Sequence, residues 1–284
     1  MKHLKILLIL LVPLAAWGAT ITGGTITGGS VNVAAGGGSQ TTSIFDDFSS
    51  DQDAHYDHLP AATCTVTAGE MNHSGAGYCK PKDTSGNTPP GDQPSMVNHW
   101  ALTHTNETTG QEKSGPVVRL DPSGSPASTA DHYLARCDPD AETGLVHLYN
   151  CTNVATCTEF HETGIVCAGG FGANVVGDII GFAVAGTAED TEFCVWFWEN
   201  AAAGPTIDDT TVPDDWGNAA ECISSDGTAA ESTMTAFFAA ATATATWDEA
   251  PDAGALDYSD TNKNCAMQSA VGGENFVEFV CGDL

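Results

Sequence analysis

From Ile44 to the C-terminus the chain alternates short apolar runs with stretches rich in Gly, Pro, Asp and Asn, and no amphipathic helix pattern interrupts this alternation. Short runs of β-branched and aromatic residues between such turn signals are typical of β-strands. The pattern therefore predicts an antiparallel all-β chain, with loops at 81–96, 121–130 and 199–232. The expected strands are 44–48, 64–68, 97–105, 116–120, 132–137, 145–150, 164–168, 178–185, 192–198, 237–247 and 275–281.

The stretch 177–198 has the strongest signal of this kind. Two apolar strands, 178–185 and 192–198, stand on either side of a turn rich in Gly and acidic residues at 186–190, as in a β-hairpin. Side chains alternate along a strand, so the second strand is apolar on both faces. Its residues are Phe193, Val195 and Phe197 on one face, and Cys194, Trp196 and Trp198 on the other. Because both faces must be covered, a two-layer β architecture is predicted, with the first of these faces between the sheets.

The first residues have the pattern of a leader. Lys2 and Lys5 precede the apolar run 6–14, and the small residues Ala16 and Gly18 stand where a signal peptidase cleaves, so we assign residues 1–18 to a signal peptide. Later apolar runs are too short to span a membrane. We therefore expect a soluble, secreted protein without membrane insertion, located extracellularly, in the periplasm or at the cell surface.

Residues 19–43 form a segment of low complexity, in which Thr-Ile-Thr-Gly-Gly occurs twice, starting at Thr20 and at Thr25. Two copies are too few for a solenoid, so we predict a flexible Gly/Thr linker. The alternative is an arm that pairs as an added strand with the sheet edge of a partner. Residues 44–284 are then expected to form a single domain.

All ten cysteines follow the leader, and an even number of cysteines in an exported chain predicts disulfides, here five. The spacings contain no Cys-x-x-Cys motif, which argues against a metal site. Among the many possible pairings we favour Cys64 with Cys79, and Cys157 with Cys167 across a turn at 161–164. The full set is Cys64, Cys79, Cys137, Cys151, Cys157, Cys167, Cys194, Cys222, Cys265 and Cys281.

The chain is strongly acidic, with a formal net charge of −29. Such a charge repels phosphate backbones, so nucleic acid is excluded as a partner. The charge has two interpretations: an acidic surface that stays soluble in a salty medium, or Asp residues that bind calcium. Most of the acidic residues are scattered along the chain, which favours the first interpretation.

The order of the apolar motifs narrows the fold. In chain order they are Phe45-Asp-Asp-Phe48, His99-Trp-Ala-Leu-Thr-His104, Gly115-Pro-Val-Val-Arg-Leu120, His132-Tyr-Leu-Ala-Arg136, Gly144-Leu-Val-His-Leu-Tyr149, Gly177-Asp-Ile-Ile-Gly181, Phe193-Cys-Val-Trp-Phe-Trp198 and Phe276-Val-Glu-Phe-Val-Cys-Gly-Asp283. Over roughly 44–284 this order resembles the laminin-G-like branch of the concanavalin A-like lectin and glucanase superfamily. The resemblance implies a jelly-roll sandwich of two curved antiparallel sheets, whose first and last strands lie side by side. Fold alone does not establish function.

The superfamily includes glycoside hydrolases, which have Glu-x-Asp-x-Glu or Glu-x-Asp-x-x-Glu on one strand so that the acids share a face. No such string occurs in this chain, and the Arg, Gln-x-His and Tyr/Lys motifs of the alginate lyases are also missing. The nearest acid pair is Asp190 and Glu192 at the start of a strand. We therefore favour a protein without catalytic residues, with an atypical polysaccharide-degrading glycoside hydrolase as the alternative.

Binding modules of the superfamily hold sugars on aromatic side chains, which pack against the apolar face of a pyranose ring. Trp196 and Trp198 share one strand face and are the first candidates for such a platform. Further candidates are Trp216, which we expect to be exposed, Trp100, Tyr133 and Tyr149. The alternative is that the tryptophans belong to a core covered by 199–232.

Many superfamily members also hold a structural calcium ion where the first and last strands meet. The matching acids here are Asp46 or Asp47 on the first strand and Asp283 on the last. Paired carboxylates with free carbonyl oxygens suit calcium, although Asp residues at strand ends are commonly solvated turn residues.

The sequence thus favours a secreted, non-catalytic jelly-roll protein that binds a glycan or a cell-surface partner. Besides the hydrolase, a third hypothesis is a structural subunit of an extracellular assembly or virion, with residues 19–43 as the assembling arm.

Overall fold

The computed structural model describes residues 26–27, 30–31, 40–49, 55–59, 64–67, 69–82, 93–95, 98–106, 114–121, 131–138, 144–153, 156–167, 177–185, 191–199, 204–216, 221–224, 262–270 and 275–284. The expected leader 1–18, the expected strand 237–247, Asp190 and the side chain of Glu192 lie outside the described residues. Among the described residues, no helix is long and apolar enough to cross a membrane.

The chain divides into two compact units, Met1–Gly36 and Gly37–Leu284. In the first unit, β1 (Ile26–Thr27) and β2 (Ser30–Val31) pair antiparallel, with Ile26 opposite Val31. Part of the expected linker is therefore a short hairpin, which keeps the strand-forming arm open as a hypothesis.

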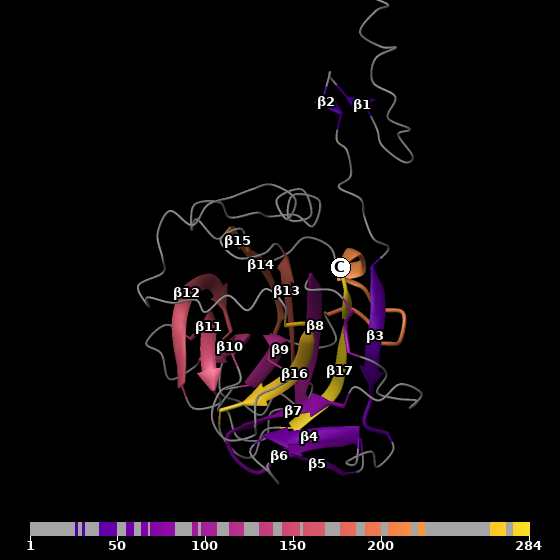
Figure 1. Cartoon of the computed structure of the whole chain (residues 1–284), viewed down its shortest axis with the longest axis vertical. Helices are drawn as coiled ribbons and strands as arrows, with labels where there is room; N and C mark the ends of the chain where they lie inside the picture. Colours follow the sequence, from indigo (N-terminus) through magenta and orange to yellow (C-terminus); the bar gives the residue numbers. More distant parts are fainter. Residues whose placement is uncertain are drawn as a thin grey trace, which may run out of the picture. The chain divides into compact units, whose positions relative to one another are not determined.

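The second unit consists of two antiparallel sheets, and the fold class expected from the sequence, an all-β sandwich consistent with a jelly roll, is confirmed (Figure 1). Sheet 1 has the strand order β12-β11-β10-β9-β16-β7-β4. Its strands are β4 (Tyr56–Leu59), β7 (Gly77–Pro81), β9 (Ser114–Leu120), β10 (His132–Asp138), β11 (Leu145–Asn153), β12 (Thr156–Val166) and β16 (Asn264–Ser269).

Sheet 2 has the order β15-β14-β13-β8-β17-β6-β5, and β3 also pairs with β17. Its strands are β3 (Thr41–Asp46), β5 (Cys64–Thr67), β6 (Glu70–His73), β8 (His99–Asn106), β13 (Asp178–Ala185), β14 (Glu192–Trp198), β15 (Glu221–Ser224) and β17 (Asn275–Asp283). The first strand of the unit, β3, lies beside the last, β17, as the family resemblance implied (Figure 1). It begins at Thr41, three residues before the expected strand.

The main core lies between the two sheets, because one cluster of buried side chains takes members from both. Phe193 and Val195 of β14 are at most 1% exposed there, and Phe197 packs against the same cluster. The prediction for this face of β14 is therefore confirmed. Two smaller apolar clusters cover the outer faces, one on sheet 2 together with the segment 204–216, and one on sheet 1.

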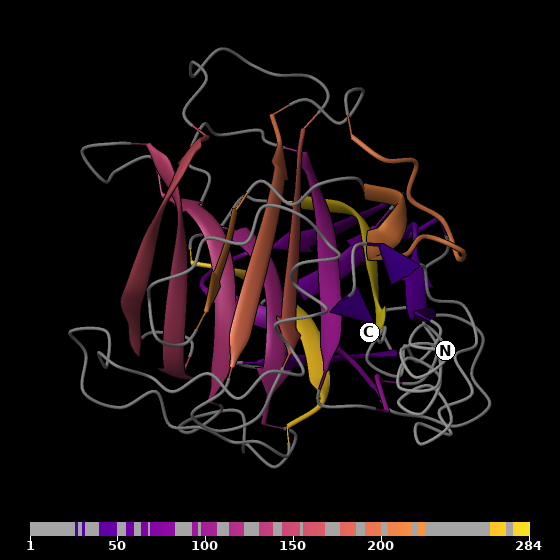
Figure 2. The ribbon, with the colours of Figure 1, turned by 90° about the horizontal axis from the view of Figure 1, so that it is seen from above.

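The segment 204–216 ends in a 3-10 helix, Pro213–Trp216, and packs against the outer face of sheet 2. The Oγ1 of Thr42 on β3 donates a hydrogen bond of 2.6 Å to the carbonyl oxygen of Thr211. Seen from above, the orange segment accordingly lies beside the indigo β3 and the C-terminus (Figure 2). Within the expected loop 199–232, residues 204–216 thus cover the outer face of sheet 2, and Glu221–Ser224 form strand β15.

All ten cysteines are paired, so the prediction of five disulfides is confirmed. The bridge Cys64–Cys79 is present as expected. The bonds are Cys64–Cys79, Cys137–Cys167, Cys151–Cys157, Cys194–Cys222 and Cys265–Cys281. Two of them, Cys64–Cys79 and Cys265–Cys281, join sheet 1 to sheet 2, which ties the two layers together covalently. Bridged cysteines of this number indicate an oxidising environment outside the cytosol.

The expected bridge between Cys157 and Cys167 is wrong, because the expected turn at 161–164 is part of a strand. Strand β12 continues from Thr156 to Val166 along β11 and places Cys157 directly opposite Cys151. The cysteines at 151 and 157 are therefore within bonding distance, with Cα atoms 4.0 Å apart. Cys167, just beyond β12, instead bonds to Cys137 on β10.

Candidate functional site

Trp196 and Trp198 lie on the outer face of sheet 2, the face that the alternation of β14 predicts. They do not form an open platform. Trp196 is 1% exposed and Trp100, on the neighbouring part of the face, is fully buried, while Trp198 is half-buried. A sugar ring has no access to the buried indoles in this conformation, so the alternative of a covered aromatic core describes this face.

The cover is Trp216, which we expected to be exposed and which is only 6% exposed. Its ring stands edge-on to three other indoles, with centroids 5.2 Å from Trp100, 5.1 Å from Trp196 and 6.3 Å from Trp198. Gly181 on β13 makes room for it, since a Cβ there would lie 2.7 Å from Cζ3 of Trp216. The expectation failed because 204–216 folds back onto the sheet and buries its own tryptophan.

Tyr133, another expected sugar ligand, is also buried. It lies on β10 and points between the sheets, where it is 4% exposed and its ring centroid is 4.8 Å from that of Phe193. Its neighbour Leu134 takes the outer face instead. The alternation of β10 therefore assigns Tyr133 to the core.

The acids expected to hold calcium are not brought together. Strands β3 and β17 are antiparallel, with Asp46 opposite Phe279 and Asp283 opposite Thr41. At about 3.4 Å per residue, this register, which contains a bulge, separates Asp46 and Asp283 by about 14–17 Å along the strands. The two carboxylates thus lie at opposite ends of the strand pair, and one ion cannot bridge them.

Each of these acids has local partners. The buried Asp46 accepts hydrogen bonds of 2.7 Å from the backbone N–H of Phe48 and from the hydroxyl of Tyr56. Burial raises the pKa of Asp46, and the Tyr56 hydroxyl opposes that shift. Asp47 accepts a bond of 3.0 Å from the backbone N–H of Ser49. The Asp283 carboxylate accepts one of 2.8 Å from the Ser95 hydroxyl.

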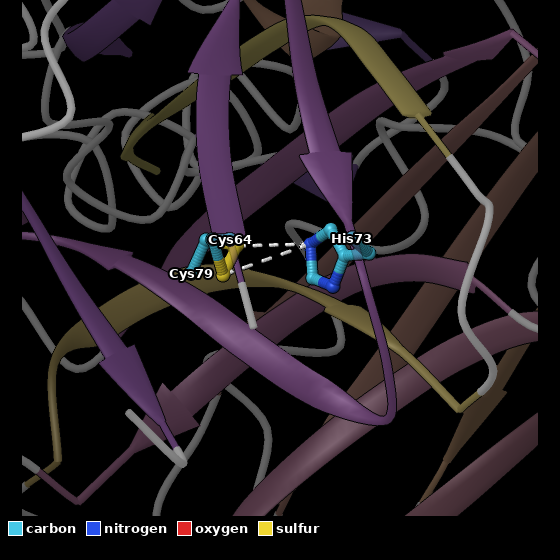
Figure 3. Close-up of side chains that lie close together, drawn as sticks. All are labelled: Cys64, His73 and Cys79. Carbon is cyan, nitrogen blue, oxygen red and sulfur yellow. Dashed lines mark hydrogen bonds between the residues drawn. A yellow bond between two sulfur atoms is a disulfide. The ribbon is translucent and has the colours of Figure 1, made fainter. Parts of the chain in front are cut away.

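His73 lies beside the Cys64–Cys79 bridge between the two sheets (Figure 3). Its Nε2 is 2.9 Å from Sγ of Cys79 and 4.0 Å from Sγ of Cys64. Burial, with a smaller contribution from nearby His58, lowers the pKa of His73 to about 3, so the ring is neutral at neutral pH. Zinc is bound by thiolates, and bridged cysteines have none to offer. This group therefore acts as part of a structural link between the sheets.

A polar cluster on the outer face of sheet 1 has a different character. We call it the β10–β12 cluster, and its members are Arg136 on β10, His147 and Tyr149 on β11, and Glu159 and Glu162 on β12. Residues directly opposite each other in an antiparallel pair share a face. Arg136 is opposite His147, His147 is opposite Glu162, and Tyr149 is opposite Glu159. The register of three adjacent strands thus gathers five polar side chains from 27 residues of chain.

The contacts within the cluster are short. The guanidinium carbon of Arg136 lies 4.2 Å from the centroid of the Tyr149 ring, the geometry of a cation–π contact. Nδ1 of His147 lies 3.0 Å from a carboxylate oxygen of Glu159. His147 and Tyr149 are 2% and 6% exposed, whereas Glu159 and Glu162 are exposed. The buried imidazole and phenol form the floor, and the two carboxylates face solvent above them.

Part of this cluster can be recognised from the sequence. Val146 and Leu148 point into the core, so alternation alone assigns His147 and Tyr149 to the other face. Glu159 was missed because residues near it were assigned to a turn. Only the register of β12 brings the two glutamates over β11.

No protein-family model matches the chain, and comparison with curated proteins gives no match. The fold defines the class of the protein as a disulfide-bonded, all-β sandwich. The resemblance to laminin-G-like jelly rolls stays a prediction, and function has to be inferred from the side chains of the β10–β12 cluster.

Proposed function

We propose that the protein is exported and binds a glycan, without catalysis, through the β10–β12 cluster on sheet 1. The observation that carries the proposal is the Arg136–Tyr149 stack, with His147 and two exposed carboxylates on the same face. Sugar hydroxyls need both donors and acceptors fixed in place. A guanidinium held over an aromatic ring supplies oriented donors, and the carboxylates supply acceptors.

The proposed contact is different from the aromatic platform expected from the sequence. The Tyr149 ring is covered by Arg136, so a sugar would meet the guanidinium and the carboxylates rather than a bare ring. The tryptophan face of sheet 2 is occupied by Trp216 and takes no part.

The charge of the chain favours a neutral glycan. A net charge of −29 creates a negative potential that repels polyanionic chains. Glu159 and Glu162 add two negative charges at the cluster itself, against the single positive charge of Arg136. We therefore expect neutral glycans to be preferred over sulfated or uronate-rich ones.

A glycan array with neutral and acidic polysaccharides tests the proposal, followed by titration calorimetry with the best binder. Arg136→Gln should weaken binding about 10- to 100-fold, since a hydrogen bond to a charged group contributes about 1.5–3 kcal/mol. Lys263→Gln removes a positive charge at an exposed position before β16 and should leave the affinity unchanged.

Two results would decide against the proposal. One is the absence of binding to every glycan, and the other is an Arg136→Gln variant that binds as tightly as Lys263→Gln. Release of new reducing ends from a bound polysaccharide would favour the hydrolase hypothesis instead.

A further inference from the structure

We infer that His147, Glu159 and Glu162 form a binding site for a divalent transition metal ion, with Zn²⁺ as the best-fitting ion. One nitrogen of His147 and one oxygen of each carboxylate all lie within 4.8 Å of one another. The site does not depend on glycan binding, because its three ligands come from the chain itself.

The distances suit a metal. Zinc binds His nitrogen and carboxylate oxygen at about 2.0–2.2 Å, so two ligands of a tetrahedral ion lie about 3.3 Å apart. Nδ1 of His147 is 3.0 Å from the nearer oxygen of Glu159, close to that spacing. The remaining pairs, within 4.8 Å, need shifts of roughly 1–1.5 Å, which exposed glutamate side chains can make by rotamer changes.

His147 gives an independent indication. It is 2% exposed, and among the described residues neither ring nitrogen makes a hydrogen bond, because the 3.0 Å approach of Nδ1 to Glu159 lacks hydrogen-bond geometry. A buried imidazole without hydrogen bonds is costly, and a metal ion would satisfy the nitrogen that faces Glu159. The backbone at His147 is fixed because its neighbours in β11, Val146 and Leu148, have side chains buried in the core.

The donor set selects the kind of ion. Imidazole suits zinc and other first-row transition metals, whereas calcium and magnesium prefer oxygen ligands alone. Three protein ligands with two of them facing solvent leave a fourth position for water or another ligand. Two other groups of potential ligands in the described part of the chain, around His73 and around His132, contain bridged cysteines and have no thiolate to offer.

Calorimetric titration of the full chain with Zn²⁺, under non-reducing conditions, tests the inference. We expect one zinc ion per chain at this site, and Co²⁺ should give the visible absorption of a low-coordinate nitrogen- and oxygen-ligated ion. Glu159→Gln and Glu162→Gln should each weaken zinc binding at least about tenfold, the scale seen even for groups that only support a ligand. His147→Ala should abolish the site.

The two glutamine variants protect the test against misfolding of the histidine variant, because both glutamates are exposed. Glu199→Gln removes the same charge at an exposed position after β14, and His104→Gln removes another histidine that contacts a glutamate, 2.8 Å from Glu278. Both controls should bind zinc as the wild type does. Equal affinities in the Glu159→Gln and Glu199→Gln variants, or no zinc binding by the wild type, would reduce the site to a simple His147–Glu159 contact and overturn the inference.

Discussion

The Trp216 ring packs directly against Gly181, so adding a single methyl group at position 181 should lower the stability of the protein markedly. In Gly181→Ala the new Cβ would lie 2.7 Å from Cζ3 and 3.1 Å from Cε3 of Trp216. Carbon atoms pack at about 3.5–4.0 Å, so the indole or its segment must move by about 1 Å. The indole cannot yield easily, because it is also held between Trp100 and Trp196.

Overpacking of this kind costs about 1–3 kcal/mol of unfolding free energy. For a domain of this size that corresponds to a Tm lowered by about 2–4 °C for each kcal/mol. Trp216→Ala by itself should cost about 3–5 kcal/mol, because it removes the cover from three indoles. In the double variant the clash disappears, so Gly181→Ala should then cost little, with a coupling energy of about 1–3 kcal/mol.

Thermal and urea unfolding, followed by far-UV circular dichroism without reducing agent, measures these differences. The matched control is Gly164→Ala on β12, where a Cβ would meet only Glu221 Oε2 at an ordinary 3.6 Å. That variant should be neutral or slightly stabilising, because alanine has less backbone freedom to lose than glycine. If Gly181→Ala behaves like Gly164→Ala, or if its cost adds fully to that of Trp216→Ala, the packing argument is wrong.

Acid should destabilise the protein through His73, because the folded-state pKa of this residue, about 3, lies below its ordinary value of 6.5. As the pH falls, the unfolded chain therefore binds the proton first. The free energy of unfolding should decrease between pH 6.5 and 3 by up to about 1.4 kcal/mol per pH unit. His73→Phe should flatten this dependence in urea unfolding curves whereas His104→Gln should not, and parallel slopes for all three proteins would contradict the assignment. The Cys137–Cys167 bridge closes a loop of 30 residues, and in the loop-entropy model its loss should cost about 3.6 kcal/mol of unfolding free energy. The Cys151–Cys157 bridge closes a loop of 6 residues, and its loss should cost about 2.2 kcal/mol. Unfolding of the two double-alanine variants measures both costs, and the reverse order would reject the loop argument.

Strands with strong alternation could be predicted from the sequence. The limits of β13 and β14 match the expected hairpin, and β9, β10 and β17 differ by at most two residues at each end. The strands β4, β6, β7, β15 and β16 were not predicted. They are four to six residues long and carry polar residues at several positions, so their periodicity is weak.

The candidate site was predicted less well than the fold. Arg136 and Tyr149 lie on predicted strands, and alternation assigns Tyr149 to the face opposite Leu148. Their proximity to Glu159 follows from the bulged register of β11 and β12, which no local pattern encodes. Most of the aromatic residues chosen as ligands are buried, namely Trp100, Trp196, Trp216 and Tyr133, whereas Trp198 is half-buried and Tyr149 belongs to the candidate site. Aromatic character alone does not distinguish a buried ring from an exposed one.

Alternation and the cysteine count were enough to predict the all-β class, the two apolar faces of β14 and the five disulfides, because both are local or compositional properties. Whether the tryptophan face of β14 is open or covered depends instead on the tertiary structure. The covering of Trp196 by Trp216, the separation of Asp46 from Asp283 and the gathering of His147 with two glutamates all depend on register and on packing between distant segments. These are long-range interactions, and no local pattern of hydrophobic and polar residues specifies them.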